Sequence, residues 1–205
     1  MNRWFVTGID TGVGKTVVST ILTHYAKADY WKPVQAGDLD ASDSGFVRAH
    51  GYSGGRIHPE RYAFATASSP HQAAACDGKC VVLDDFELPE TNQSLVVEGA
   101  GGLLVPINQQ EFMIDLVLKL DLPVVLVIRD YLGCINHTLL SVEVLRQRKI
   151  KIACAVFNGD FNPWTESLLS ARFGNEAPIL KIPYLTSFCR ENIQEIGSTL
   201  QTALF

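Results

Sequence analysis

The segment GIDTGVGKT, residues 8–16, constrains the fold more than any other part of the chain. It follows a short apolar run and precedes a helical pattern, and its glycines let backbone amides approach a ligand closely. Backbone N–H groups at such a junction bind phosphate, while Lys15 reaches the outer phosphates and the Thr16 hydroxyl ligates Mg²⁺. Five residues separate Gly8 from Gly14, one more than the usual pattern allows, but the context still favours a phosphate-binding loop (P-loop).

Apolar strand patterns and helical patterns alternate along the rest of the chain, with no repeat or linker. The expected strands are residues 4–7, 31–34, 95–98, 123–128, 152–157 and 179–182. The expected helices are residues 15–27, 43–50, 112–120, 135–148, 163–173 and 191–204. This order predicts an α/β fold of three layers, a P-loop fold whose mostly parallel central sheet is covered by helices on both faces. Residues 1–205 are expected to form a single ATP-binding domain.

Charge and composition exclude several classes of partner. A net charge of −5 argues against nucleic acid, because binding its backbone requires a basic surface. The longest apolar stretch, residues 122–128, is too short to cross a membrane. The first residues lack a secretion signal and the five scattered cysteines fit reduced thiols, so we expect a cytoplasmic protein. Cys76 and Cys80 lack the second pair of ligands that a zinc site needs.

Polar and glycine-rich residues follow most of the expected strands. Ligands of such sheets bind outside the carboxyl ends of the strands, so these residues are expected to form one site. Glu98, in LVVEGAGG, ends a buried strand, where a carboxylate needs either a salt-bridge partner or a metal. Lys32, in WKPVQAG, is either a surface lysine or a group that stabilises developing negative charge. Asp43 either caps the helix that follows it or ligates Mg²⁺.

The segment LGCINH, residues 132–137, leads into a helix. The free N–H groups at the start of this helix could bind a carboxylate. His137 lies in the same segment, but the sequence places no carboxylate or nucleophile beside it. We therefore assign it no role as a base.

Together these segments resemble the dethiobiotin synthetase family. The matching segments are FVTGIDTGVGKT, KPVQAG, SPH at residues 69–71, VVEGAGG, LPVVLVI, LGCINH, Asn158 after its strand, and IPYL at residues 182–185. They follow the order of the family from residue 5 to residue 185, and the combination of VEGAGG with GCINH is specific. The five-residue spacing in the P-loop is normal in this family.

The resemblance implies an ATP-dependent ring closure in biotin biosynthesis. In this reaction 7,8-diaminopelargonate and CO2 form a carbamate, ATP phosphorylates the carbamate, and the second amine displaces phosphate to give dethiobiotin. Lys15 and Lys32 would be the catalytic residues that flank the transferred charge, and Thr16, Asp43 and Glu98 would hold Mg²⁺. The residues implied for nucleotide binding are Gly12, Val13, Gly14, Lys15, Thr16, Val17, Asp43, Glu98, Gly99, Ala100, Gly101, Asn158, Gly159, Pro183, Tyr184 and Leu185. The residues implied for substrate binding are Lys32, Ala36, Gly133, Cys134, Ile135 and Asn136.

The family also implies a homodimer with shared active sites. The segment Gly133 to Asn136 would then bind the substrate carboxylate in the site of the other subunit. Two positions depart from the family: Ala36 stands where Ser or Thr is frequent, and Gly12 stands where some members have Glu. The missing hydroxyl at position 36 removes one contact to the diamine or carbamate.

Two other functions remain open at this point. An amidoligase of the cobyrinate type shares the ATP-binding fold, but it normally carries a glutaminase domain for which 205 residues leave no room. A P-loop nucleotide switch of the partition or nitrogenase-iron type carries a second lysine early in the loop. Asp10 occupies that position here, which disfavours the switch.

Overall fold

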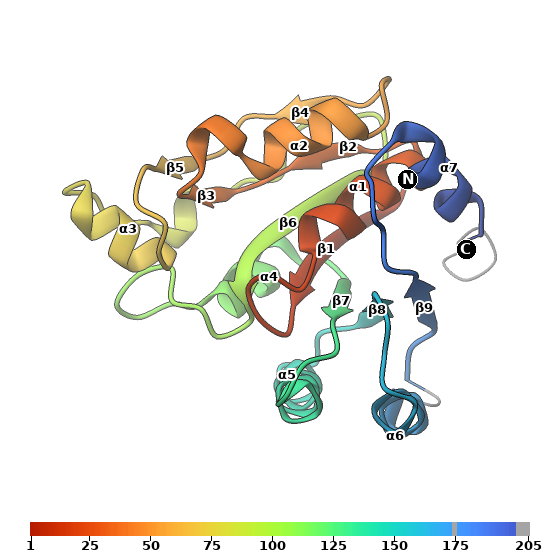
Figure 1. Cartoon of the computed structure of the whole chain (residues 1–205). Coiled ribbons are helices and arrows are strands. Elements are labelled where there is room, and N and C mark those ends of the chain that lie inside the picture. Colours follow the sequence, from red (N-terminus) through yellow and green to blue (C-terminus); the bar gives the residue numbers. More distant parts are fainter. Residues whose placement is uncertain (174–175, 200–205) are drawn as a thin grey trace.

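The computed structural model describes residues 1–173 and 176–199 and shows a central sheet flanked by helices (Figure 1). The strands of the described residues pair in parallel, and the main sheet has seven strands in the order β4-β2-β6-β1-β7-β8-β9. These strands are β1 (Arg3–Gly8), β2 (Asp29–Trp31), β4 (Ile57–His58), β6 (Leu95–Gly102), β7 (Val124–Ile128), β8 (Ile152–Asn158) and β9 (Ile179–Ile182). A separate two-stranded sheet contains β3 (Val34–Ala36) and β5 (Tyr62–Phe64).

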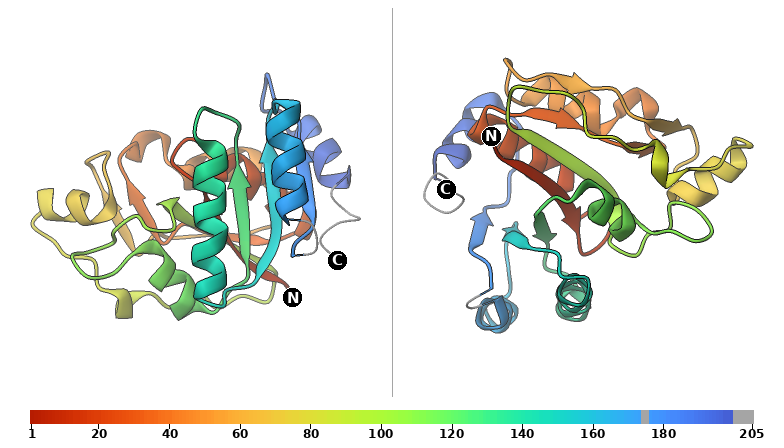
Figure 2. Two further views of the ribbon diagram at one scale, coloured as in Figure 1. Left: turned by 90° about the horizontal axis from the view of Figure 1, so that it is seen from below. Right: turned by 180° about the vertical axis from the view of Figure 1, so that it is seen from behind.

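Helices cover both faces of the main sheet (Figures 1 and 2). One face carries α1 (Lys15–Ala26), α2 (Asp43–His50) and α7 (Arg190–Thr199). The other face carries α4 (Met113–Leu120), α5 (Cys134–Gln147) and α6 (Pro163–Phe173). The short helix α3 (Pro70–Cys76) lies beside the small sheet, and 3₁₀ turns occupy Leu39–Ala41 and Leu83–Asp85. The three-layer α/β prediction is therefore confirmed.

Strand β1 lies in the middle of the main sheet and ends in the P-loop. It pairs with β6 on one side and β7 on the other, so Val6 stands opposite both Glu98 and Val125. All five residues of β7 are buried, as expected for a strand that has helices on both sides. The register brings the residues that follow β1, β6, β7 and β8 to one edge of the sheet.

The expected strand over residues 31–34 is wrong, because the chain leaves the main sheet at Lys32 and Pro33. β2 ends at Trp31, and β3 begins at Val34 in the other sheet. Pro33 has no N–H to donate to a ladder, whereas its carbonyl oxygen accepts bonds from the backbone of Arg61 and Tyr62. This break turns Lys32 out of the strand pattern and toward the site.

Other boundaries also differ from the expectation. β6 continues to Gly102, four residues beyond its expected end, and the short elements β4, β5 and α3 were not predicted. They have two, three and seven residues, too few for a clear periodic pattern. For the last helix, the expected residues 200–204 lie outside the described part of the chain. Within the described part, no helix has the length and apolar character to cross a membrane.

Candidate active site

The P-loop is closed on one side by Asn158 at the end of β8. The Asn158 side-chain amide donates a 2.9 Å hydrogen bond to the backbone oxygen of Val13. Gly14 has φ 93°, and a Cβ at that position would lie 2.0 Å from the Asn158 amide nitrogen. Only glycine fits this contact, because the conformation and the close approach both exclude a side chain.

Lys15 lies buried in the loop, where a backbone oxygen accepts a hydrogen bond from its ammonium group. Its Nζ donates to the backbone oxygen of Asp10 at 3.0 Å. Burial, followed by the nearby charge of Lys32, lowers the pKa of Lys15 from 10.5 to about 8, although Glu98, Asp43 and Asp10 act in the opposite direction. The ammonium group is thus poorly compensated and available for an anionic ligand.

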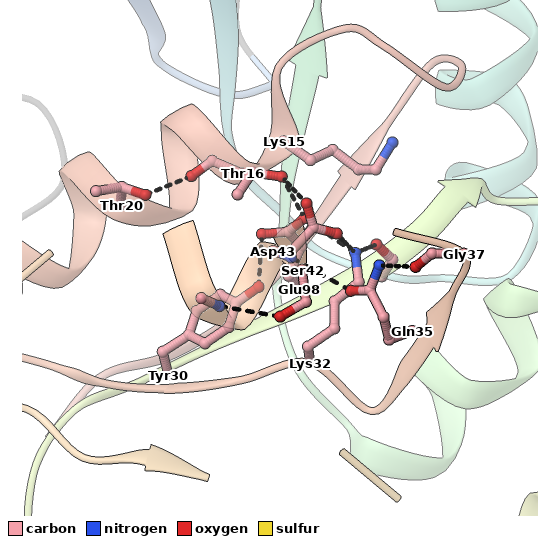
Figure 3. Close-up of polar contacts among 12 residues, drawn as sticks. Lys15, Thr16, Thr20, Tyr30, Lys32, Gln35, Gly37, Ser42, Asp43 and Glu98 are labelled. Carbon is pink, nitrogen blue, oxygen red and sulfur yellow. Dashed lines mark hydrogen bonds and ion pairs between the residues drawn. The ribbon is translucent and has the colours of Figure 1, made fainter. Parts of the chain in front are cut away.

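Lys32 lies in a quite different environment (Figure 3). Its Nζ contacts Asp43 Oδ2 at 2.6 Å, Glu98 Oε1 at 3.0 Å and the Gly99 carbonyl oxygen at 3.1 Å. Burial lowers the pKa of Lys32, but the charges of Glu98 and Asp43 outweigh this effect and the pKa is raised. Lys32 is therefore a fully charged member of a buried ion pair, and the surface-lysine alternative is wrong.

Glu98 is completely buried and bonded on both of its oxygens. Oε1 accepts from Lys32 and lies 3.0 Å from the Thr16 hydroxyl, and Oε2 accepts from the Tyr30 hydroxyl at 3.0 Å. Burial is the main cause that raises the pKa of Tyr30 well above its usual range, so this hydroxyl remains a donor. The expected salt bridge of Glu98 is present, in the same place as the candidate metal ligands.

Asp43 is free to face the site because another residue caps its helix. The Ser42 side chain accepts the cap hydrogen bond from the backbone of Gly45 at 3.2 Å, which excludes the cap role that the sequence left open for Asp43. The Asp43 carboxylate instead accepts a 2.6 Å bond from the Thr16 hydroxyl. Burial raises its pKa, but the charge of Lys32 outweighs this effect and holds the pKa below the usual range.

Three side chains with oxygen atoms that can ligate a metal therefore meet at one point: Thr16 on α1, Asp43 on α2 and Glu98 on β6 (Figure 3). Hydroxyl and carboxylate oxygens are the ligands that Mg²⁺ prefers, usually together with phosphate oxygens and water. The donor set fits this metal. Among the described residues no group of three His, Cys, Asp or Glu side chains gathers at one point, so the Thr16 hydroxyl is needed as the third ligand.

These residues share one cleft of about 650 Å³. Of the residues predicted for the site, the cleft is lined by Gly12, Gly14, Lys15, Thr16, Val17, Lys32, Ala36, Asp43, Glu98, Ala100 and Gly101. Val13 and Gly99 adjoin it through the backbone oxygens described above. The structure thus brings together the predicted phosphate, metal and lysine positions.

The remaining nucleotide positions lie beside Asn158. The backbone N–H of Gly159 donates to the oxygen of Ile182, and a Cβ on Gly159 would lie 4.0 Å from the Tyr184 ring. Pro183, Tyr184 and Leu185 follow β9, and Tyr184 is well exposed. Ile182, the last residue of β9, pairs with Asn158, so these residues begin directly beside the strand end that carries Asn158.

The segment Gly133 to Asn136 does not line this cleft. Gly133, with φ 106°, precedes the first turn of α5, which begins at Cys134. Before the segment, Arg129 donates to the Gly12 carbonyl oxygen at 3.4 Å, and after it His137 lines a second cavity together with Ile9 and Asp10. Within one chain, the predicted substrate positions therefore fall into two separate groups.

Several residues of the site were missed by the sequence reasoning. Tyr30 carries no recognisable motif because it lies inside an ordinary strand. Gln35 is buried and joins two loops, since its amide donates to the Gly37 oxygen and its Oε1 accepts from the Asp43 backbone. Ser69 lines the cleft, and the SPH segment was the signal that could have placed it there.

Phosphate binding is expected to weaken above pH 8. Lys15 is charged below its pKa of about 8, and only the charged form attracts phosphate. The dissociation constant for ADP should rise about twofold from pH 7 to 8 and then by up to about tenfold per pH unit. Calorimetric titration measures this dependence. Lys15→Arg stays charged and should give a flat profile, and a flat profile for the unaltered protein would contradict the shifted lysine.

Comparisons with known proteins give matches over most of the chain. A family model described as an AAA domain matches residues 2–192. ATP-dependent dethiobiotin synthetase BioD of Cytophaga hutchinsonii is 47% identical over 176 residues, which cover 85% of each chain. The protein of that name from Christiangramia forsetii is 49% identical over 167 residues, 81% of this chain and 80% of the relative. That of Rhodopseudomonas palustris (strain BisB18) is 45% identical over 198 residues, 96% of this chain and 94% of the relative.

Proposed function

Because the chain belongs to the ATP-dependent dethiobiotin synthetase family, we propose that it uses ATP to form dethiobiotin from 7,8-diaminopelargonate and CO2. The observation that supports this reaction best is that two lysines share the cleft, one with a lowered pKa and one with a raised pKa. Lys15 is an under-compensated cation at the P-loop, and Lys32 is a paired cation across the cleft. A phosphoryl group that passes from ATP to a carbamate carries its charge between two such groups.

The P-loop binds and orients the phosphates in this proposal. Lys15 gives up its bond to the Asp10 carbonyl oxygen and donates to the transferred phosphoryl group. When bound at Thr16, Asp43 and Glu98, Mg²⁺ would neutralise charge on the outer phosphates. Asn158 donates to Val13, so its Oδ1 is left to accept from the amino group of the nucleotide base. Pro183, Tyr184 and Leu185 flank the base.

Lys32 positions the carbamate. Its ammonium group has three hydrogens, and its three contacts use all of them. Lys32 can therefore bond the substrate only if one of these three hydrogen bonds is replaced by a bond to the substrate. Asp43 is the most exposed of the three partners, with 30% of its side chain exposed, so the bond to Asp43 is the one to be exchanged. The freed hydrogen then stabilises the negative charge of the carbamate oxygen.

The function is tested by measuring dethiobiotin formation and ATP consumption with the diamine and bicarbonate present together or singly. We expect ATP consumption to require both. ATP hydrolysis that needs neither would favour the nucleotide switch, and a requirement for ammonia would favour the amidoligase.

We further propose that the protein is a single domain, lies in the cytoplasm and forms a homodimer. We propose no nucleic-acid or membrane partner.

The dependence of activity on Mg²⁺ concentration is expected to change when the Asp43 or Glu98 carboxylate is removed. Asp43→Asn and Glu98→Gln keep the shape of the side chain but lose its charge, so each should raise the Mg²⁺ concentration for half-maximal activity by about 10–100-fold. Activity measured against Mg²⁺ concentration tests this. Asp40→Asn, an exposed carboxylate in the neighbouring turn, serves as a control that should leave the curve unchanged. Unchanged curves for both site variants would contradict the metal assignment.

A shared site in a dimer is expected to allow complementation between two inactive variants. The start of α5 lies outside the cleft, and its free N–H groups attract a carboxylate. If it serves the partner, a mixed dimer of Lys15→Ala and Asn136→Ala chains has one site with both lesions and one site with neither. Co-expressed and purified mixed dimers should regain up to about half of the activity. No recovery in verified mixed dimers would contradict sharing.

A further inference from the structure

Ser69 and His71 form a hydrogen-bonded pair at the start of α3. The Ser69 hydroxyl oxygen lies 2.8 Å from His71 Nδ1. Ser69 occupies the N-cap position, where a serine usually accepts a backbone bond worth about 1 kcal/mol, but here it makes no cap bond. Pro70 fixes the first helical position, and the His71 backbone donates to the Pro106 carbonyl oxygen at 3.3 Å. The hydroxyl is thus directed to the imidazole instead of the helix.

This pair stands at the wall of the active-site cleft. Ser69 and Pro70 line the same cleft as Lys32 and Glu98, whereas His71 is half-buried behind Ser69 and does not line it. A proton taken up by Ser69 could therefore pass to His71 and from there to solvent.

The proposed ring closure releases a proton that the other groups of the cleft are poorly placed to accept. Lys15 is held among the phosphates, and Lys32 is a charged cation. Asp43 and Glu98 are both bonded to Lys32 and Thr16. Asp38 also lines the cleft but is exposed to solvent. Histidine is the side chain that most readily exchanges protons at neutral pH.

We propose that Ser69 and His71 carry the proton away from the amine during ring closure. This step rests on the proposed function. The amine nitrogen forms a bond to the carbamate carbon, and the bond from that carbon to the phosphate oxygen breaks. Phosphate leaves with the electron pair. The amine proton passes to the Ser69 hydroxyl oxygen as the Ser69 proton passes to His71 Nδ1, and the resulting imidazolium releases its Nε2 proton to solvent.

The two residues have different roles. Ser69 contacts the amine and is the catalytic residue of the pair, and His71 acts through it as a positioning residue. Three segments pack against α3: β3 carries no titratable side chain, β5 carries Tyr62, bonded to Asp85, and the segment of Pro106 carries Glu111, bonded to Asn108. On the cleft side the charged groups are Lys15, Lys32, Asp38, Asp43 and Glu98.

The test compares His71→Gln and Ser69→Ala with the unaltered protein. Each should lower kcat for dethiobiotin by about 10²–10⁴-fold, the usual contribution of a positioned proton acceptor, with little change in the KM for ATP. We expect kcat of the unaltered protein to fall at acidic pH and this fall to be absent in both variants. ATP consumed per dethiobiotin should rise, because the phosphorylated carbamate is hydrolysed before the ring closes. Gln72→Ala, a variant of the exposed neighbour that bonds only Ser68, is the matched control.

The outcomes separate this proposal from the function on which it rests. An unaltered protein that makes no dethiobiotin would contradict the proposed function. An active protein whose two variants keep its kcat and pH profile would overturn the role of the pair alone. The same holds if Asp38→Asn, and not His71→Gln, removes the acid limb. Loss of ADP binding in both variants would assign the pair a structural role and would also overturn the proposal.

Discussion

Replacing Lys15 by alanine is expected to abolish turnover while the protein remains as stable as before. Lys15 lies where charge is transferred, and removal of one such donor costs about 10²–10³-fold in kcat, or roughly 3–4 kcal/mol. Its stability contribution is small for a physical reason: burial lowers its pKa, and only one backbone oxygen accepts from it. The folded state therefore gains little from the charge, and alanine removes a desolvated ammonium group.

Turnover and urea unfolding should be measured on the same preparation of the Lys15→Ala protein. Lys151→Ala, which removes an exposed lysine at the start of β8, is the control and should change neither quantity. Near-normal ring closure by the Lys15→Ala protein would show that the P-loop assignment is wrong. A large loss of stability would show that the lysine is compensated in the folded protein.

Unlike Lys15→Ala, Lys32→Met is expected to lower both the activity and the stability of the protein. Glu98 has no exposed surface, and within the described part of the chain Lys32 is the only cation that forms a salt bridge with it. Removal of one member of a buried ion pair leaves an uncompensated charge and typically costs 3–5 kcal/mol. We therefore expect the free energy of unfolding to fall by about that amount. The Tyr30 hydroxyl remains as a donor to Glu98, whereas the single hydrogen of the Thr16 hydroxyl is shared with the closer Asp43.

The double variant Lys32→Met with Glu98→Gln separates charge from packing. The neutral amide can accept from the Tyr30 hydroxyl through its oxygen and donate to the Thr16 hydroxyl oxygen through its NH₂, so most of the lost stability should return while activity stays absent. Urea unfolding of the single and double variants measures the recovery. If Lys32→Met alone unfolds within 1 kcal/mol of the unaltered protein, a figure well below the usual cost, the ion pair is solvated in solution.

The sequence predicted the parts of the fold and site whose chemistry is visible in short motifs. The P-loop, Glu98 with its glycines, and the family could be identified because the residue types and their order are specific, and the family is confirmed by the comparisons. The alternation of elements also predicted the parallel sheet, since strands buried on both faces are apolar throughout. The binding roles of the site residues stay predictions.

The rest depended on contacts between distant segments. Pro33 divides one expected strand into two sheets, and no local pattern shows where the second strand pairs. Serine and aspartate have similar preferences for the N-cap position, so the sequence alone does not show whether Ser42 or Asp43 caps α2. Tyr30 becomes part of the site only because its strand lies beside β6. Such positions are decided by tertiary packing, which the sequence does not display locally.

The central place of β1 affects how the chain emerges from the ribosome. Its two neighbours, β6 and β7, end at residues 102 and 128 of 205, so the first strand made has no partner on one edge until half of the protein exists and none on the other until well over half exists. At the usual speed of translation this interval is on the order of 10 seconds. Pairing over such sequence separations is slow, and unpaired apolar strands attract other chains. The nascent polypeptide therefore carries an apolar strand with an open edge through this interval, and its P-loop gains its full support only when β7 has joined the sheet.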